Sequence, residues 1–320
     1  MPRALAERRR GVTFIRHKPS IKQLSSTMND QKTLQTLLSQ IIQNNTTPEA
    51  WQWLQEKAAF IQTEKGAAAL NTAFAAVPRK TGAATIAQSQ KENETFLQLQ
   101  PPLNLDGWSV DRMARVWLLM PIDASDKEVY FQKIEELFLS ATMNELVALY
   151  SALPMLQYPQ LWRHRCTEGI RSNIGNVLEA IMCDNIYPSQ NLDEGAWNQL
   201  VLKAFFTEKP VHRIVALDAR ANKALAYTLS DYAHERWAAG RPVNPQLWRC
   251  VAPFIDETLF ADVVRLSQSD IEVEREVAAL ICQQSNFAPC KQLLQQPVLQ
   301  PYMHQKLSWQ IIADKAAAAV

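Results

Sequence analysis

Apolar residues recur with a period of about 3.6 along almost the whole chain, a pattern that allows little besides α-helices. Helix-start signals such as Thr47-Pro48 and Asn244-Pro245, and the stop signal Gly240-Arg241-Pro242, divide the pattern into segments. Glycine is scarce, with 8 residues, which disfavours the turns of a β-sandwich. We therefore expect no strand, and helices at about 31–43, 48–63, 67–77, 84–96, 109–119, 126–140, 143–152, 159–184, 191–207, 218–239, 245–254, 257–268, 271–284 and 303–317. The segment 97–107 is expected to be a long exposed loop.

The five-residue sequence PQLWR occurs twice, at 159–163 and again 86 residues later at 245–249. This offset equals two units of 43 residues, close to the ~40–47-residue period of HEAT-type repeats. The sequence thus predicts an all-α fold: an α-solenoid of stacked antiparallel helical pairs, HEAT-like, in a single elongated or curved domain over 28–320. Within it, 28–107 would form N-terminal helices and 108–320 a helical repeat region.

The first 27 residues are basic, with seven Lys and Arg against one acid, whereas the whole chain has a net charge of only +1. Such a segment suits a transit peptide or a nucleic-acid-binding tail. It also suits a disordered extension or an over-extended start, and this interpretation is favoured because a clear helix start follows Met28. The remaining chain is mildly acidic, which argues against a nucleic-acid partner.

The five cysteines, at 166, 183, 250, 282 and 290, form no CxxC pair and have no histidine at metal-ligand spacing. This usage is typical of a reducing compartment, so we expect a cytoplasmic protein. The sequence contains no apolar run of 18 residues, so no transmembrane segment is expected.

Known catalytic motifs do not fit. His234-Glu235 begins an H-E-x-x-H pattern, but position 238 is alanine, which excludes a zinc-protease helix. No glycine-rich phosphate loop or nucleophile elbow is present. We accordingly predict no metal and no cofactor.

Polar residues nevertheless interrupt the apolar faces of three expected helices. A helical wheel places Arg171 between Leu178 and Met182 in 168–184, and Asn198 within the apolar arc of 191–207. In the expected helix 218–239, four polar residues lie on one side of the helix, within reach of a common ligand. They are Arg220, Tyr227, Asp231 and His234.

These six residues have two interpretations. They could satisfy one another and the helix ends, because an unpaired buried polar group costs about 1–3 kcal/mol. Alternatively, they could line a pocket for a small metabolite between helices. His234 beside Asp231 could also perform acid–base chemistry, although a lone histidine on a helix is more often structural.

The sequence between Glu168 and Arg249 resembles the EboA family of metabolite-traffic proteins. The similarity lies in EGIRSNIGNVLEAI, in YPSQNLDEGAWNQLVLKAFF and in LDARANKALAYTLSDYAHERWAAGRPVNPQLWR, and it covers roughly 155–295. It implies a cytoplasmic helical protein encoded in a small operon with a prenyltransferase-like membrane protein and sugar-phosphate- or isomerase-like enzymes. The operon's implied role is to move a secondary-metabolite precursor towards the periplasm, as in scytonemin-type pigment biosynthesis.

Three functions remain open at this stage. The leading one is a non-enzymatic protein that binds a metabolite or pathway proteins during trafficking. The second is an enzyme acting on a small aromatic or prenylated precursor through His234, Asp231 and Arg171. The third is a scaffold that holds pathway enzymes near the membrane.

Overall fold

The computed structural model describes residues 21–62, 66–99 and 102–318, which form an all-α fold. Over these residues there is no strand, and the extended pairing consists of two isolated β-bridges. The α-helices are α1 (Ile21–Asn44), α2 (Pro48–Ile61), α3 (Gly66–Thr81), α4 (Gln90–Leu97), α5 (Val110–Leu119), α6 (Lys127–Ser140), α7 (Met143–Ala152), α8 (Arg163–Arg171), α9 (Gly175–Met182), α10 (Tyr187–Asn191), α11 (Glu194–Phe206), α12 (Lys223–Ala238), α13 (Leu247–Val251), α14 (Phe260–Ser267), α15 (Glu272–Gln284), α16 (Ala288–Leu294) and α17 (Trp309–Ala318). Short 3-10 helices are η1 (Leu153–Met155), η2 (Pro159–Trp162), η3 (Val211–Arg213), η4 (Ala252–Phe254) and η5 (Gln300–Tyr302).

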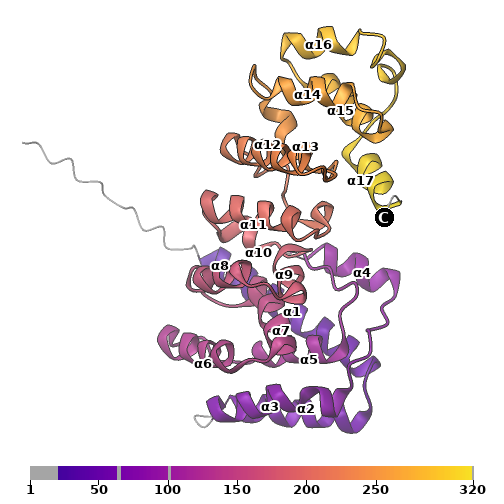
Figure 1. Cartoon of the computed structure of the whole chain (residues 1–320). Helices are drawn as coiled ribbons and strands as arrows, with labels where there is room; N and C mark the ends of the chain where they lie inside the picture. The colour runs from indigo at the N-terminus through magenta and orange to yellow at the C-terminus, as the bar shows by residue number, and fades with distance from the viewer. Residues whose placement is uncertain (1–20, 63–65, 100–101, 319–320) are drawn as a thin grey trace, which may run out of the picture.

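The helices are stacked in successive layers, from α2 and α3 at one end to α16 at the other (Figure 1). Most contacts join helices that are close in sequence, such as α2 with α3, α12 with α13, and α14 with α15. In the N-terminal half, α5 contacts α1, α2, α3 and α7, and α7 contacts α9. This arrangement brings the segment before α5 close to α7 and α9.

Large side chains fill the interior of the stack. Trp162 and Trp248, the tryptophans of the two PQLWR segments, are both fully buried. Their backbones differ, because the first segment forms η2 whereas the second enters α13 after a turn. The repeated sequence therefore provides two equivalent buried anchors without the same local structure.

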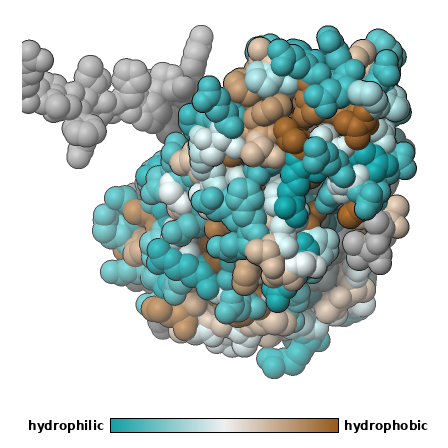
Figure 2. Space-filling view, turned by 45° about the horizontal axis from the view of Figure 1, so that its top comes forward, coloured by the Kyte–Doolittle hydropathy of each residue, from teal (hydrophilic) through white to brown (hydrophobic). Residues whose placement is uncertain are grey.

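The face of the molecule seen in Figure 2 is mainly hydrophilic, with smaller hydrophobic groups between the polar residues. The most exposed large apolar side chains of the described residues are Leu139 and Phe206. Of the helices in the described ranges, none has the length and apolarity needed to cross a membrane.

The helix predicted at 159–184 is wrong as a single element. Residues 172–174 are not helical, and they separate α8 from α9. Ser172 and Ile174 have extended backbone angles, and the Asn173 side chain accepts a hydrogen bond from Lys203 Nζ at 2.8 Å. The wheel position predicted for Arg171 fails for the same reason, since Arg171 ends α8 and cannot project between Leu178 and Met182.

Other helix boundaries in the structure also differ from the predicted ones. The predicted helix 218–239 begins only at Lys223, because the Asn222 side chain caps it by accepting the amide of Leu225 at 2.9 Å. The helix predicted at 84–96 begins at Gln90, where Ser89 and Glu92 form a capping box. The helices α10 and α16 were not predicted, and the segment predicted as helical at 303–317 is helical only from Trp309.

The N-terminal boundary differs from the expectation as well. α1 begins at Ile21, so residues 21–27 belong to the first helix and not to a separate extension. The remainder of the predicted basic extension, 1–20, lies outside the described residues.

Candidate functional site

A polar cavity of about 410 Å³ lies where the segment before α5 meets α7 and α9. Its wall also includes Arg213, the last residue of η3, and Cys183 and Asp184, which directly follow α9. Most of the lining is charged or carries side-chain amides. The polar and charged lining residues are Asn104, Asp106, Ser109, Asp111, Arg112, Asn144, Asn176, Glu179, Asp184 and Arg213.

The first wall is held by extended backbone before α5. Thr85 and Ser109 form an antiparallel bridge. On either side of it, the Ile86 amide donates to the Trp108 carbonyl and the Val110 amide donates to the Ala84 carbonyl, both at 2.9 Å. These bonds fix the 104–109 turn against the start of α5.

The opposite wall uses the second bridge, between Cys183 and Ile214. The Asp184 amide donates to the Arg213 carbonyl at 2.9 Å. Asp184 has a φ of 54°, a left-handed backbone conformation that non-glycine residues rarely adopt. Its carboxylate accepts from Arg213 Nε at 2.8 Å, which holds the residue in this conformation.

Three of the four lining acids have a cation of their own. The pairs are Asp111 with Arg115 at 2.6 Å, Glu179 with Lys209 at 2.7 Å, and Asp184 with Arg213. The fourth acid, Asp106, is exposed on the turn before Trp108. Most of the negative charge around the cavity is therefore neutralised within the protein.

Arg112 is arranged differently. Its Nε donates to the Ser151 hydroxyl at 2.8 Å, and its guanidinium lies over the Trp108 ring, 4.1 Å from the centroid. Burial and the positive charge of Arg213 lower the pKa of Arg112 to about 10, so it remains charged at neutral pH. Arg112 thus brings a cation to the cavity without a carboxylate bonded to it.

The lining offers little for covalent catalysis. It contains no histidine, and burial raises the pKa of the Cys183 thiol to about 11, which leaves a protonated, weakly nucleophilic sulfur. Across the described residues there is no cluster of three histidine, cysteine or acidic side chains suited to a metal. The cavity can bind and orient a polar molecule through amides and Arg112.

The six residues predicted as a site do not come together, and none lines this cavity. Arg171 is exposed at the end of α8. Asn198 exchanges amide hydrogen bonds with Asn222, at 2.8 and 3.2 Å. Arg220 precedes α12, where it donates to three carbonyls at the end of α10 and lies 4.7 Å from the Trp197 ring centroid.

Tyr227, Asp231 and His234 do share α12, but their contacts diverge. The Tyr227 hydroxyl donates to Asp256 at 2.6 Å, whereas Asp231 is exposed. His234 Nε2 lies 2.5 Å from the carboxylate of Asp262 in α14. The predicted stripe therefore forms separate contacts to neighbouring elements.

The His234 contact has the residues of a catalytic triad in the wrong order. Asp262 is buried and lies between its two partners, accepting from the Ser230 hydroxyl at 2.6 Å and contacting His234 with its other oxygen. A nucleophilic triad requires the histidine between serine and acid. The arrangement ties α12 to α14 and does not activate Ser230.

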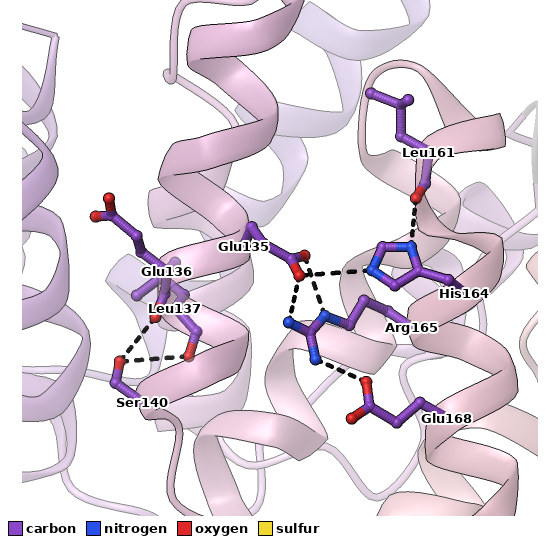
Figure 3. A network of polar contacts seen from close by, with 8 residues as sticks. All are labelled: Glu135, Glu136, Leu137, Ser140, Leu161, His164, Arg165 and Glu168. Carbon is purple, nitrogen blue, oxygen red and sulfur yellow. Dashed lines mark hydrogen bonds and ion pairs between the residues drawn. The ribbon is translucent and has the colours of Figure 1, made fainter.

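A further polar network joins α6 to α8 (Figure 3). Arg165 Nε and Nη2 both donate to Glu135, and Nη1 donates to Glu168 at 2.6 Å. His164 Nε2 lies 3.5 Å from Glu135. Because the Arg165 charge already has two carboxylates, this network is a structural connection between helices.

Sequence reasoning missed the cavity because part of its lining comes from non-helical segments that only the fold brings together. Asn104 and Asp106 lie in the predicted loop 97–107, and Asp184 and Arg213 flank the second bridge. Helical wheels test only residues within a helix. The signal available was local: the sequence NLDGWS, with Gly107 at a positive φ of 71°, marks a tight polar turn directly before a helix.

Residues 34–252 match the model of a family described as metabolite traffic protein EboA. The match starts earlier and ends earlier than the resemblance noted from the sequence, and it contains every lining residue of the cavity. Asp256 and Asp262, the partners of Tyr227 and His234, lie beyond it. No curated protein and no solved structure matches the chain.

Proposed function

Because this chain belongs to the EboA family of metabolite traffic proteins, we propose that it binds a small metabolite in the polar cavity beside α5, α7 and α9 and passes it on unchanged. The observation that carries this proposal is the cavity itself. Its volume of about 410 Å³ falls within the range of small-molecule sites, about 300–1,000 Å³.

The rigidity of the walls supports binding. Both bridges are closed by backbone hydrogen bonds, and Asp184 is held by Arg213. A site formed before its ligand arrives loses less conformational entropy on binding. The side-chain amides of Asn104, Asn144 and Asn176 can each donate and accept hydrogen bonds.

The chemistry of the lining favours a carrier over an enzyme. Cys183 is protonated and three of the four lining acids are paired with cations, which leaves the exposed Asp106 as the one unpaired carboxylate of the lining. In this proposal the protein acts in the cytoplasm, as the family resemblance implies. Its stacked helices form a HEAT-like solenoid that could also hold operon-encoded enzymes or a prenyltransferase-like membrane protein.

The test is to release and identify small molecules from the gently purified protein by mass spectrometry. Asn176 is an exposed lining residue of α9, so Asn176→Trp should fill the cavity without disturbing the core. We expect a retained molecule in the wild type and its loss in this variant. The matched control is Gln199→Trp, on the exposed side of α11, which should retain it. Equal retention in both variants, or none in the wild type, would contradict the proposal.

The pathway-enzyme alternative rests on the contact of His234 with the buried Asp262. Its predicted catalytic partners do not take part in this contact, since Asp231 is exposed and Arg171 ends α8. A folded double variant, His234→Ala with Asp231→Asn, should still support metabolite export in cells. If export stopped in that variant, the enzyme would replace the carrier. Co-purification of a membrane prenyltransferase without any retained small molecule would favour the scaffold.

A further inference from the structure

The arginines that the helices bury are matched to acceptors, with one exception. Arg165 has two carboxylates and Arg115 has one, as do the exposed Arg213 and the partly buried Arg249. Arg220 lacks a carboxylate but donates to three backbone carbonyls. Arg112 has one neutral acceptor, the Ser151 hydroxyl, and that bond uses Nε.

Both Nη nitrogens of Arg112 are without a partner among the described residues. Trp108 covers a face of the guanidinium plane, so the remaining donors point along its edge. A guanidinium presents its donors as a planar fork that suits the two oxygens of a carboxylate or phosphate. The geometry therefore leaves a two-donor fork at a cavity wall.

The charges around Arg112 also favour an anion. Asp111 and Asp184 are the nearby acids, and each is bonded to another arginine. Arg213 contributes a second positive charge that opposes the charge of Arg112. Arg112 is partly desolvated, lies near a like charge and has few acceptors. An anionic ligand therefore stabilises it more than it would stabilise a fully solvated cation.

We propose that Arg112 is the anchor of the cavity and binds an anionic group of the ligand, a carboxylate or a phosphate monoester, through its two Nη nitrogens. This inference rests on the proposed function, because it requires that the cavity be a ligand site. It adds the class of ligand and the residue that recognises it. The rest of the ligand lies towards the amides of Asn144 and Asn176.

The test uses three probes that share a phenyl ring: benzoate, phenyl phosphate and the uncharged benzyl alcohol. Titration calorimetry on the full chain at pH 7.5 should show one anion binding at least about tenfold more tightly than the alcohol. Comparison of benzoate with phenyl phosphate distinguishes the two sources of charge. Arg112→Gln should lower the affinity for that anion by about 10- to 100-fold, as expected for lost charged hydrogen bonds.

Two controls keep the result specific. Arg163→Gln removes an exposed arginine on α8 away from the cavity and should leave the affinity unchanged. Fluorine NMR of fluorotryptophan-labelled protein reports the place of binding, because the signal that disappears in Trp108→Phe belongs to the ring under Arg112. The bound anion should shift this signal.

The outcomes separate the two proposals. If the alcohol binds as well as the anions, or if Arg112→Gln binds them unchanged, the anionic ligand class is wrong although the cavity can still be a site. If Asn176→Trp does not lower the affinity for the anion and the Trp108 signal does not shift, the assignment of this cavity as the binding site is wrong. Lack of saturable binding of both anions at millimolar concentration also overturns the assignment of Arg112.

Discussion

At the scale of single residues, the arginines of this protein differ in their bonding partners. Some are paired with carboxylates within the protein, whereas Arg112 is not. Arg165 spans α6 and α8 with its charge shared between Glu135 and Glu168, whereas Arg112 donates only to the Ser151 hydroxyl. The buried Arg165 and the half-buried Arg112 can therefore differ in what their removal costs. The difference can be measured without knowing any ligand.

Arg165→Met should destabilise the ligand-free protein by about 1–3 kcal/mol, since Glu135 would lose its bidentate partner. Arg112→Met should change the free energy of unfolding by less than about 1 kcal/mol, because the lost bond to Ser151 is offset by removal of a desolvated charge. Urea unfolding of both variants at one pH provides the comparison. Equal losses would mean that Arg112 has a structural role like that of Arg165.

Sequence reasoning recognised the polar residues of α12 but not their partners. Tyr227 and His234 bind Asp256 and Asp262, which lie after α13 in the chain, so no wheel drawn on α12 could pair them. Arg112 gave no sequence signal either. Its importance depends on the absence of a carboxylate partner in three dimensions, and neighbours in the chain do not determine that.

At the scale of elements, apolar periodicity located most helices but could not detect the interruption between α8 and α9. The apolar stripe passes through the break, from Ile170 in α8 to Val177 in α9, so the pattern resembles a continuous helix. The close approach of these helices depends on Gly169. A Cβ atom there would lie 2.4 Å from Ile181 Cδ1 and 2.6 Å from the Tyr150 ring.

Gly169→Ala should therefore destabilise the protein by about 1–3 kcal/mol, since the buried Tyr150 and Ile181 side chains must move to admit the methyl group. The matched control is Gly175→Ala in the first turn of α9, where the nearest atom to the new Cβ is the flexible Lys209 Nζ at 3.4 Å. Alanine there should be neutral or stabilise by up to about 1 kcal/mol. Thermal unfolding of both variants measures the effects, and a similar melting temperature for the two would contradict the packing at Gly169.

At the scale of the whole molecule, the all-α class is confirmed, whereas the HEAT-like solenoid stays a prediction. The class was predictable because helix periodicity is local. The order of contacts was harder to predict, since α5 meets α1, α3 and α7 through long-range packing. In a solenoid each layer contacts only its neighbours, so the free energy of unfolding is approximately a sum of contributions from single layers and from the interfaces between adjacent layers.

Leu54→Ala, at a fully buried position of α2, should therefore loosen mainly the first layers, at a cost of about 2–5 kcal/mol. Hydrogen exchange should accelerate in α2, α3 and α5 and remain slow in α14 and α15. The reciprocal variant Leu280→Ala in α15 should reverse the pattern. Acceleration spread evenly over the chain in either variant would indicate one cooperative unit in place of a solenoid.

The two bridges beside the cavity have a mechanical consequence. One belongs to the segment before α5, and the other joins the end of α9 to the residue after η3. The width of the cavity therefore follows the tilt between these two parts of the stack. In the proposed function, a molecule bound across the cavity would contact both parts and restrict this tilting.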